Sequence, residues 1–316
     1  MSRIPMPPQL PPGSFLVVDA DALGLSRRQL SRAGIFTPSR GIRVPLHGTG
    51  SVAENVRAYT RLDPRCVLTH CSAARICGIC LPAWLEQDWK IHIARPSDGC
   101  KPRRRNVVGH QLSFKPGEVI SFDGVRLTSP ARTWLDLAAR LSLSELVAAG
   151  DSIVVSHGDE FPVPRKPLAT VADLKEIVGQ HPGMRGVKIA RLALDLIRVG
   201  SDSAPETMMR LALVQAGLPE PALNVVLRNG LSHPVVWPDA AYPDQRLSLQ
   251  YDGAHHGDPD QYRRDIKRQS LTESLGWREL RVQQGDLEGE RPFVVEKVRA
   301  VLSSSSSRAH SERTGS

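Results

Sequence analysis

The sequence contains no apolar run long enough to cross a lipid bilayer, which takes roughly 20 consecutive apolar residues in a helix. It also lacks the apolar core of a secretory signal peptide, because residues 1–12 are rich in proline instead. These absences argue against a membrane-embedded or secreted protein. We therefore expect a cytoplasmic protein with no membrane partner.

Cysteine is scarce, with 5 residues among 316, and we expect these thiols to be reduced in the cytoplasm. Four of them lie in the predicted helix Cys66–Cys80, where Cys77 and Cys80 have a spacing found in zinc sites. A structural zinc site needs a second pair of ligands, and only His70 and Cys71 of the same helix are nearby. Buried thiols on an alanine-rich helix are the better interpretation.

The charge is strongly basic, with a formal net charge of +8 and an isoelectric point near 9.5. The basic residues gather at Arg27-Arg28, at Lys101–Arg105 and between Arg263 and Arg268. One such cluster is usually a solvated face, whereas several together favour a polyanionic partner. We expect that partner to be DNA, with RNA as the alternative that the sequence does not separate from it.

Residues 14–44 have the pattern of a small DNA-binding head. Ser26–Gln29 is a capping box that begins a helix, and Gly34 marks the end of that helix. A preceding helix at Asp19–Leu23 would complete a helix-turn-helix, and Gly41–Val44 would follow as the strand of a wing. The arginines predicted to contact nucleic acid are Arg27, Arg28 and Arg32. A surface helical hairpin without a ligand is the alternative.

Residues 52–150 are predicted to form a separate α+β segment without a catalytic constellation. Its predicted strands are Trp89–Ala94, Val107–Phe114 and Val119–Leu127, the last interrupted by a turn at Phe122–Gly124. Ser129 and Pro130 together indicate a helix start, a capping residue followed by proline at the first helical position.

The segment Trp237–His256 brings chemistry-bearing residues together. Asp239 lies on one predicted strand, Asp252 ends the next, and His255 and His256 follow closely. Two adjacent strands would deliver their carboxylates to one end of a sheet, which suits a hard cation such as Mg²⁺. A divalent cation can stabilise both the attacking and the leaving oxygen of phosphodiester hydrolysis. The segment therefore predicts a metal-dependent nuclease site.

Short motifs of the C-terminal third occur in a matching order: Ser203–Glu206, Arg210, Pro238-Asp239, Gln250–Gly253, His255-His256, Arg264-Asp265 and Leu275–Arg278. In these motifs the chain resembles the Vsr-like branch of the PD-(D/E)xK nucleases, which includes the very short patch repair endonucleases. Upstream, Thr69–Ala74 and Thr128–Ala131 resemble actinobacterial proteins of the AbiEi antitoxin type, on motifs that carry no chemistry.

The resemblance implies an α+β or α/β multidomain chain. The expected domains are a Pro-rich leader and winged-helix-like DNA-binding head at 1–50, an AbiEi-like α+β segment at 51–155, a linker with helices at 156–200, a Vsr-like nuclease domain at 201–302, and a disordered tail at 303–316. The nuclease domain would be a restriction-endonuclease-like mixed sheet flanked by helices.

The resemblance also implies roles for individual residues. The catalytic set would be Asp239, Asp252, His255, His256, Gln250 and Glu206. The metal, Mg²⁺ or Mn²⁺, would be held by Asp239, Asp252 and the carbonyl of Tyr251. One histidine would help to activate water, and Glu206 would approach a second metal ion or form a helix ion pair with Arg210. The nucleic-acid contacts on the following helix would be Arg264 and Arg268.

Gln250 departs from the family pattern, which has glutamate at this position. A neutral amide is a weaker ligand for Mg²⁺ than a carboxylate, so a weak or inactive site is a real alternative. Asp252 stands where lysine is common, although the Vsr-like branch uses histidine instead. The expectation is an endonuclease acting on duplex DNA. The alternative is a non-catalytic antitoxin or transcriptional regulator with a degenerate nuclease fold, and a second copy or a cognate toxin as partner.

Overall fold

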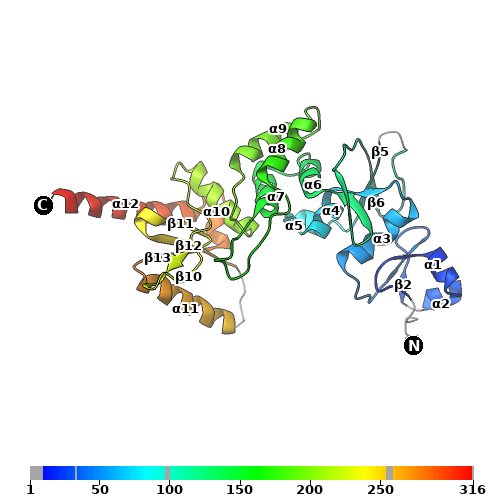
Figure 1. The fold of residues 1–316 in the computed structure, drawn as a ribbon, viewed down its shortest axis with the longest axis horizontal. Helices are drawn as coiled ribbons and strands as arrows, with labels where there is room; N and C mark the ends of the chain where they lie inside the picture. The colour runs from blue at the N-terminus through cyan, green and yellow to red at the C-terminus, as the bar shows by residue number, and fades with distance from the viewer. Residues whose placement is uncertain (1–9, 33, 97–99, 254–258, 315–316) are drawn as a thin grey trace. The chain divides into compact units, whose positions relative to one another are not determined.

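The computed structural model describes residues 10–32, 34–96, 100–253 and 259–314. The chain divides into two compact units (Figure 1), one of residues 1–141 with 172–190, the other of residues 142–171 with 191–316. Both units combine helices with strands, so the α+β multidomain class is confirmed at this level. None of the described helices is both long and apolar enough to cross a membrane.

The first unit begins with a small head in which two short helices precede a hairpin. Its elements are β1 (Phe15–Leu16), α1 (Val17–Ala22), α2 (Arg27–Arg32), β2 (Ile35–Phe36) and β3 (Ile42–Pro45). The strands pair antiparallel in the order β1-β3-β2. The predicted capping box begins α2: the Ser26 amide donates to Gln29 Oε1 at 2.8 Å, and the Gln29 amide donates to Ser26 Oγ at 3.3 Å. Phe15, Ala20 and Leu30 form the core of the head.

A five-stranded sheet in the order β6-β5-β4-β8-β7 follows the head. The elements are α3 (Val52–Leu62), β4 (Val67–Leu68), α4 (His70–Cys77), α5 (Ala83–Glu86), β5 (Ile91–Pro96), β6 (Val107–Leu112), β7 (Val119–Phe122), β8 (Val125–Thr128) and α6 (Pro130–Leu137). The predicted helix over Cys66–Cys80 is wrong at its start, because Val67 and Leu68 pair with β5 and β8 instead. Burial of both side chains in the sheet outweighs the helical preference of the alanine-rich sequence that follows.

The predicted turn at residues 122–124 and the predicted helix start at Ser129 are both confirmed. Asp123 and Gly124 both adopt positive φ, 48° and 73°, in the turn between β7 and β8, which is the backbone that a two-residue hairpin turn requires. Ser129 caps α6, with Pro130 at the first helical position and the Ser129 side chain accepting from the Arg132 amide at 3.4 Å.

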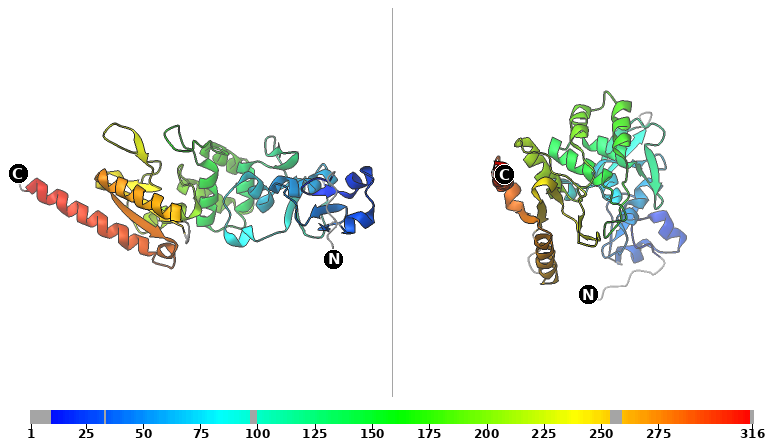
Figure 2. Two further views of the ribbon diagram at one scale, coloured as in Figure 1. Left: turned by 90° about the horizontal axis from the view of Figure 1, so that it is seen from below. Right: turned by 60° about the vertical axis from the view of Figure 1, so that its left-hand side comes forward.

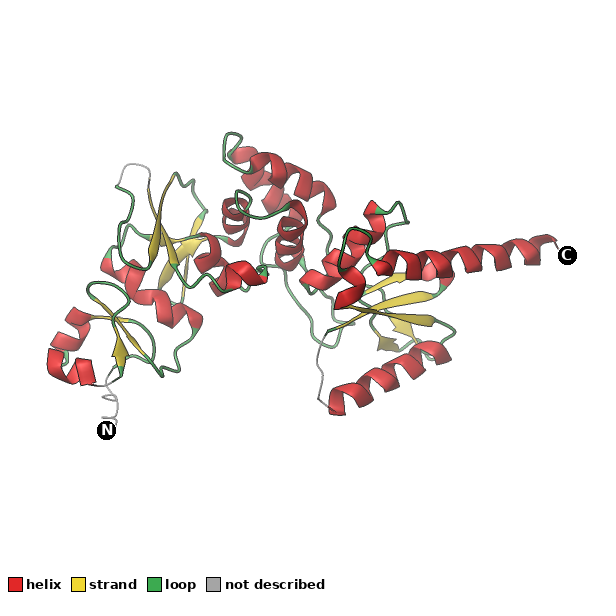
Figure 3. Ribbon diagram, turned by 180° about the vertical axis from the view of Figure 1, so that it is seen from behind, coloured by secondary structure: helices red, strands yellow, loops and turns green. Residues whose placement is uncertain are grey.

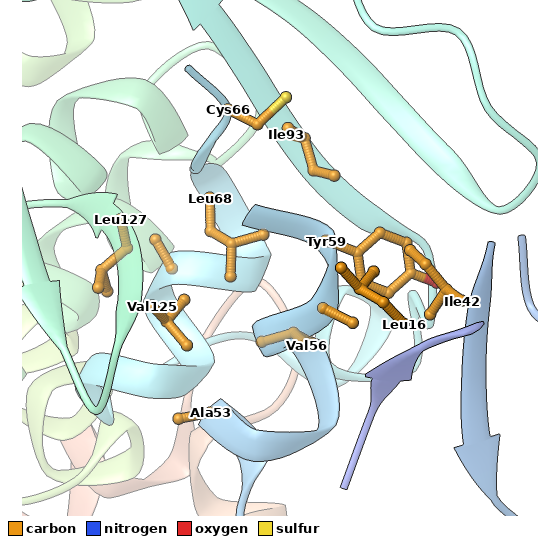
Figure 4. Close-up of a cluster of buried hydrophobic side chains, with 12 residues drawn as sticks. Leu16, Ile42, Ala53, Val56, Tyr59, Cys66, Leu68, Ile93, Val125 and Leu127 are labelled. Carbon is orange, nitrogen blue, oxygen red and sulfur yellow. The ribbon is translucent and has the colours of Figure 1, made fainter. Parts of the chain in front are cut away.

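One apolar cluster joins the head to the sheet (Figure 4). Leu16 and Ile42 of the head strands pack with Tyr59 of α3, and the same cluster includes Leu68 and Ile93 of the sheet. The head and the α+β segment therefore share a core across the boundary expected at residue 50.

The expected linker at 156–200 contains two helices. These helices are α8 (Val171–Gln180) and α9 (Val187–Leu196), and α7 (Leu143–Val154) precedes the linker. In the second unit, α7 packs against α10 (Ala204–Gln215) through the buried ion pair between Asp151 and Arg210, 2.8 Å apart. Residues 155–170 form a loop closed by a bridge between His157 and Arg165.

The C-terminal part of the second unit is a mixed sheet between helices. Its elements after α10 are β9 (Leu227–Arg228), β10 (Pro234–Val236), β11 (Ala240–Tyr242), η1 (Pro243–Gln245), β12 (Leu247–Asp252), α11 (Pro259–Ser274), β13 (Arg278–Gln283), η2 (Gln284–Leu287) and α12 (Phe293–Thr314). β12 lies in the middle, antiparallel to β11 and parallel to β13, and β9 and β10 form a separate hairpin. This part agrees with the expected mixed sheet flanked by helices.

The two faces of this sheet differ in character because side chains alternate along a strand. Leu247, Leu249 and Val282 pack against α10 and α12 in the apolar core. On the other face, Thr272 of α11 donates to the buried Glu279 of β13 at 3.5 Å. The sheet lies between α11 and α12 (Figure 3).

The segment after Ser303, predicted to be disordered, is helical in the structure. Figure 2 shows α12 as one continuous helix that reaches Thr314. Serine only weakly opposes helix formation, so a helix nucleated by the buried Val294–Val301 turns can extend through it.

Candidate functional site

The carboxylate of Asp239 is held by two hydrogen bonds from β12. Asp239 directly precedes β11, and the pairing of Ala240 with Leu249 brings it beside the end of β12. Its Oδ1 accepts from Gln250 Nε2 at 2.7 Å, and its Oδ2 accepts from the Tyr251 amide at 2.6 Å. The backbone therefore fixes one oxygen, while a side-chain amide occupies the other.

Glu206 is the second carboxylate of the site and is held at the start of α10. Its Oε2 accepts from the Asp202 amide at 2.7 Å, and its Oε1 accepts from the Ser203 hydroxyl at 2.7 Å. The predicted alternative, an ion pair between Glu206 and Arg210, is wrong. Arg210 instead contacts Asp151 and Glu220, because its side chain is directed into the buried contact with α7.

Asp239 and Glu206 influence one another electrostatically. Burial, together with the charge of Asp239, raises the pKa of Glu206 to about 7. Burial likewise raises the pKa of Asp239 to about 6, although the hydrogen bonds from Tyr251 and Gln250 and the charge of Arg268 act against the rise. Around pH 5 to 6, both carboxyl groups therefore hold protons that ordinary surface carboxylates would have lost.

Both carboxylates face a cavity of about 250 Å³. Its wall is formed by His157, Phe161, Pro162, Val163, Gly200, Asp202, Asn224, Trp237 and Pro238 in addition to Glu206 and Asp239. His157 is fixed there by contacts with Asp202 Oδ2 at 2.8 Å and Asn224 Oδ1 at 3.0 Å. Sequence reasoning missed His157 because it lies in a proline-rich loop with no motif around it.

The side-chain oxygen of Gln250 differs from its nitrogen in making no hydrogen bond within the described structure. Its Oε1 is buried, and among the residues that the structure describes it has no hydrogen-bond partner. An unsatisfied buried oxygen is costly, on the order of 1–3 kcal/mol. Because Gln250 Nε2 is the atom that faces Asp239, Oε1 could join Asp239 around a cation only if the amide turned over.

The polar face under α11 contains a network of charges beside Gln250. Arg281, the register partner of Gln250 on β13, contacts Glu279 at 3.2 Å. Arg268 contacts Glu279 at 3.5 Å and Asp265 at 2.8 Å. Two carboxylates thus hold the Arg268 side chain, and its predicted contact with phosphate stays a prediction.

The remaining predicted site residues have varied surroundings. Asp252 ends β12 and is half-buried, and it does not line the cavity of Asp239 and Glu206. Tyr251 contacts Asp239 through its amide, and the role predicted for its carbonyl stays a prediction. His255 and His256 lie outside the described residues.

The arginines predicted to bind nucleic acid lie on two helices. On α2 these are Arg27, Arg28 and Arg32, and on α11 they are Arg264 and Arg268. The side chains of Arg28 and Arg264 are exposed. Their exposure is compatible with the predicted contact with a polyanion, which stays a prediction.

None of the five cysteines is in a disulfide, and the interpretation against a cysteine zinc site stays a prediction. Cys66 and Cys71 are buried, and Cys77 and Cys80 are half-buried. Burial raises the pKa of the Cys77 thiol to about 11, which disfavours the thiolate that zinc requires.

Comparison with known proteins gives distant relatives only. An uncharacterised protein of Mycobacterium tuberculosis, found in strains CDC 1551 / Oshkosh and ATCC 25618 / H37Rv, is 28% identical over 189 residues. The match covers 59% of this chain and spans 64% of the length of these curated relatives. No family model and no solved structure matches the chain.

Proposed function

We propose that the second unit is a divalent-cation-dependent phosphodiesterase that acts on duplex DNA, with Asp239 and Glu206 at its centre. The observation that carries the proposal is the pair itself: two carboxylates face one cavity, and both have a raised pKa. Perturbed carboxyl groups that meet in a cavity favour a functional site over a merely structural one.

The residues fit a hard cation. Mg²⁺ and Mn²⁺ prefer oxygen ligands, and Asp239 and Glu206 supply carboxylates whose repulsion a cation would relieve. Gln250 would add its buried oxygen, which has no partner in the described structure, if its amide turned over on binding the cation. A bound cation would polarise the phosphoryl group and lower the pKa of a bound water.

The chain itself orients these ligands. The Tyr251 amide fixes one oxygen of Asp239, and the Asp202 amide with the Ser203 hydroxyl fixes Glu206. In the proposal, a histidine of the pair His255-His256 takes the proton of the attacking water. The basic residues of α2 and α11 hold the DNA backbone, since phosphate contacts position a duplex without reading its sequence.

A second function, a nucleic-acid-binding regulator without catalysis, is favoured by the contact between Gln250 and Asp239. The Gln250 Nε2 donor occupies Asp239 Oδ1 at 2.7 Å, where a glutamate would need a cation between the two carboxylates. A neutral donor satisfies Asp239 without any metal. Such a regulator would resemble the antitoxin type, with a cognate toxin or a second copy as partner.

Plasmid nicking with Mg²⁺ or Mn²⁺ separates the two functions. The informative variant is Asp239→Asn, because the amide retains an oxygen for the Tyr251 amide while removing the charge. The matched control is Asp244→Asn, which changes an exposed aspartate of the same unit. We expect cleavage by the wild type and the control, and none by Asp239→Asn.

The variant Gln250→Glu tests the regulator directly. If the site is weakened by its amide, the glutamate should increase cation-dependent cleavage. DNA binding by the wild type, with no cleavage by either protein at any cation concentration, would refute the phosphodiesterase and support the regulator.

A further inference from the structure

Three histidines distant in the sequence meet in the first unit. His70 is the first residue of α4, His92 lies on β5, and His110 lies on β6. β5 and β6 are parallel with His110 opposite Ala94, two residues after His92, so both histidines project from the same face of the sheet. One ring nitrogen from each histidine lies within 4.8 Å of the other two.

The hydrogen bonds of His70 leave one nitrogen free to bind a ligand. The Thr69 hydroxyl donates to Asp136 Oδ2 at 2.6 Å, and it lies 3.1 Å from His70 Nδ1. Since the hydroxyl proton is directed to Asp136, the hydroxyl oxygen accepts from His70 Nδ1–H. The lone pair of the neutral ring then lies on Nε2.

His92 has the same type of support from a carboxylate. Its Nε2 lies 3.5 Å from Asp88 Oδ2, so the proton of the neutral ring is directed to Asp88 and the lone pair lies on Nδ1. Histidine ligands of metals commonly donate their other N–H to a carboxylate in this way. The second carboxylate, Asp136, supports His70 through Thr69.

The contact between His92 and His110 has the spacing of two ligands of one ion. Their Nδ1 and Nε2 atoms are 3.1 Å apart. Two nitrogens bound to a tetrahedral Zn²⁺ at ~2.0–2.1 Å would lie roughly 3.3 Å apart. In the absence of metal, one proton lies between these nitrogens, and a cation would replace it.

The site is largely buried: His70 and His92 are buried and His110 is half-buried. The charged groups that face the cluster are the cations Arg75, Arg132, Arg140 and Lys101 and the anion Asp88.

The backbone at His70 is strained, which is unusual for a helix start. Its φ is 50°, in the left-handed region that favours glycine. Strain of this kind is concentrated at functional sites. The His70 ring stacks on His110 with ring centroids 4.0 Å apart and an interplanar angle of 16°, so one of the two rings must turn for both nitrogens to bind the same ion.

We propose that His70, His92 and His110 form a three-imidazole site for a borderline divalent cation of the Zn²⁺ class, with a fourth position for an exogenous ligand. Imidazole nitrogen suits Zn²⁺ and its neighbours, whereas Mg²⁺ prefers oxygen. The site lies in the first unit, so it is independent of the phosphodiesterase proposed for the second.

The test is Co²⁺ and Zn²⁺ binding by the full chain after metal removal with a chelator. Co²⁺ reports tetrahedral coordination through its visible absorption, and competition with a chromogenic chelator gives the Zn²⁺ affinity. The ligand variant is His110→Ala, and the matched control is His47→Ala, which removes an exposed histidine of the same unit. A double variant, His255→Ala with His256→Ala, removes the other candidate imidazoles.

We expect tetrahedral Co²⁺ absorption from the wild type, His47→Ala and the double variant, and its loss in His110→Ala. Asp88→Asn should weaken Zn²⁺ binding by about 10- to 100-fold, the effect typical of a group that orients a histidine ligand. Far-UV circular dichroism checks that each variant is folded. Equal Zn²⁺ affinity in folded His110→Ala and wild type would overturn the proposal, as would the absence of tetrahedral Co²⁺ binding by the wild type.

Discussion

Replacing Glu206 by glutamine tests whether burial and the nearby charge of Asp239 raise the pKa of Glu206 in the folded protein. The change removes one charge of the pair and keeps the shape of the side chain. A carboxyl group whose pKa is raised on folding stabilises the folded state below its unfolded pKa, and that stability is lost as pH rises through the folded pKa. The stability that the protonated Glu206 contributes is therefore lost between pH 4.5, its ordinary pKa, and about pH 7, its pKa in the folded protein.

The expected size of the effect follows from this window. A rise from 4.5 to about 7 corresponds to roughly 3 kcal/mol at ~1.4 kcal/mol per pH unit. Glu206 is only half-buried, so solvent screening reduces the effect to about 2 kcal/mol. Between pH 4.5 and pH 8, Glu206→Gln should therefore gain about 2 kcal/mol of unfolding free energy relative to the wild type.

The assay is urea unfolding across this pH range, with and without Mg²⁺. Glu54→Gln is the matched control, because Glu54 occupies the same capping-box position at Ser51 on the exposed start of α3. The control measures the loss of a capping hydrogen bond without the neighbouring carboxylate. Added Mg²⁺ should stabilise the wild type at pH 8 and have little effect on Glu206→Gln. Parallel pH curves for the wild type and Glu206→Gln would refute the raised pKa of Glu206.

Two further predictions concern the backbone and the basic surface. Gly186→Ala should destabilise the protein by roughly 1–3 kcal/mol, because φ is 87° and an added Cβ would lie 2.4 Å from the Ala138 carbonyl carbon. Gly183→Ala is the control and should have little effect, because the space around Gly183 is open. Equal melting temperatures for the two variants would contradict the reasoning. Changing Arg27 and Arg28 together to alanine should weaken DNA binding and reduce its salt dependence, as measured by fluorescence anisotropy at several salt concentrations; an unchanged salt slope would exclude α2 from the interface.

The candidate site was predicted only in part. The sequence indicated Asp239 and Gln250, and the structure joins them through a hydrogen bond of 2.7 Å. It did not indicate that Glu206 is bound by its own helix start, or that Arg210 is directed away to Asp151. The contact of Arg210 with Asp151 depends on how α7 packs against α10, which no local pattern encodes, whereas the contacts of Glu206 are local to the start of α10.

The sequence by itself determined the local features of this protein. The capping box at Ser26, the N-cap Ser129 of α6, the turn at Asp123 and Gly124, and the capped start of α10 each depend on residues a few positions apart. Interactions over so short a distance are nearly the same in any fold, so their signals can be read from the chain.

Only the tertiary structure decided which distant residues meet. His70, His92 and His110 converge because β5 and β6 are parallel and α4 begins beside them, and Val67-Leu68 is a strand because β5 and β8 pair with it on either side. Strand order and register depend on the burial of the whole sheet, and a shift of one residue would turn each side chain to the opposite face.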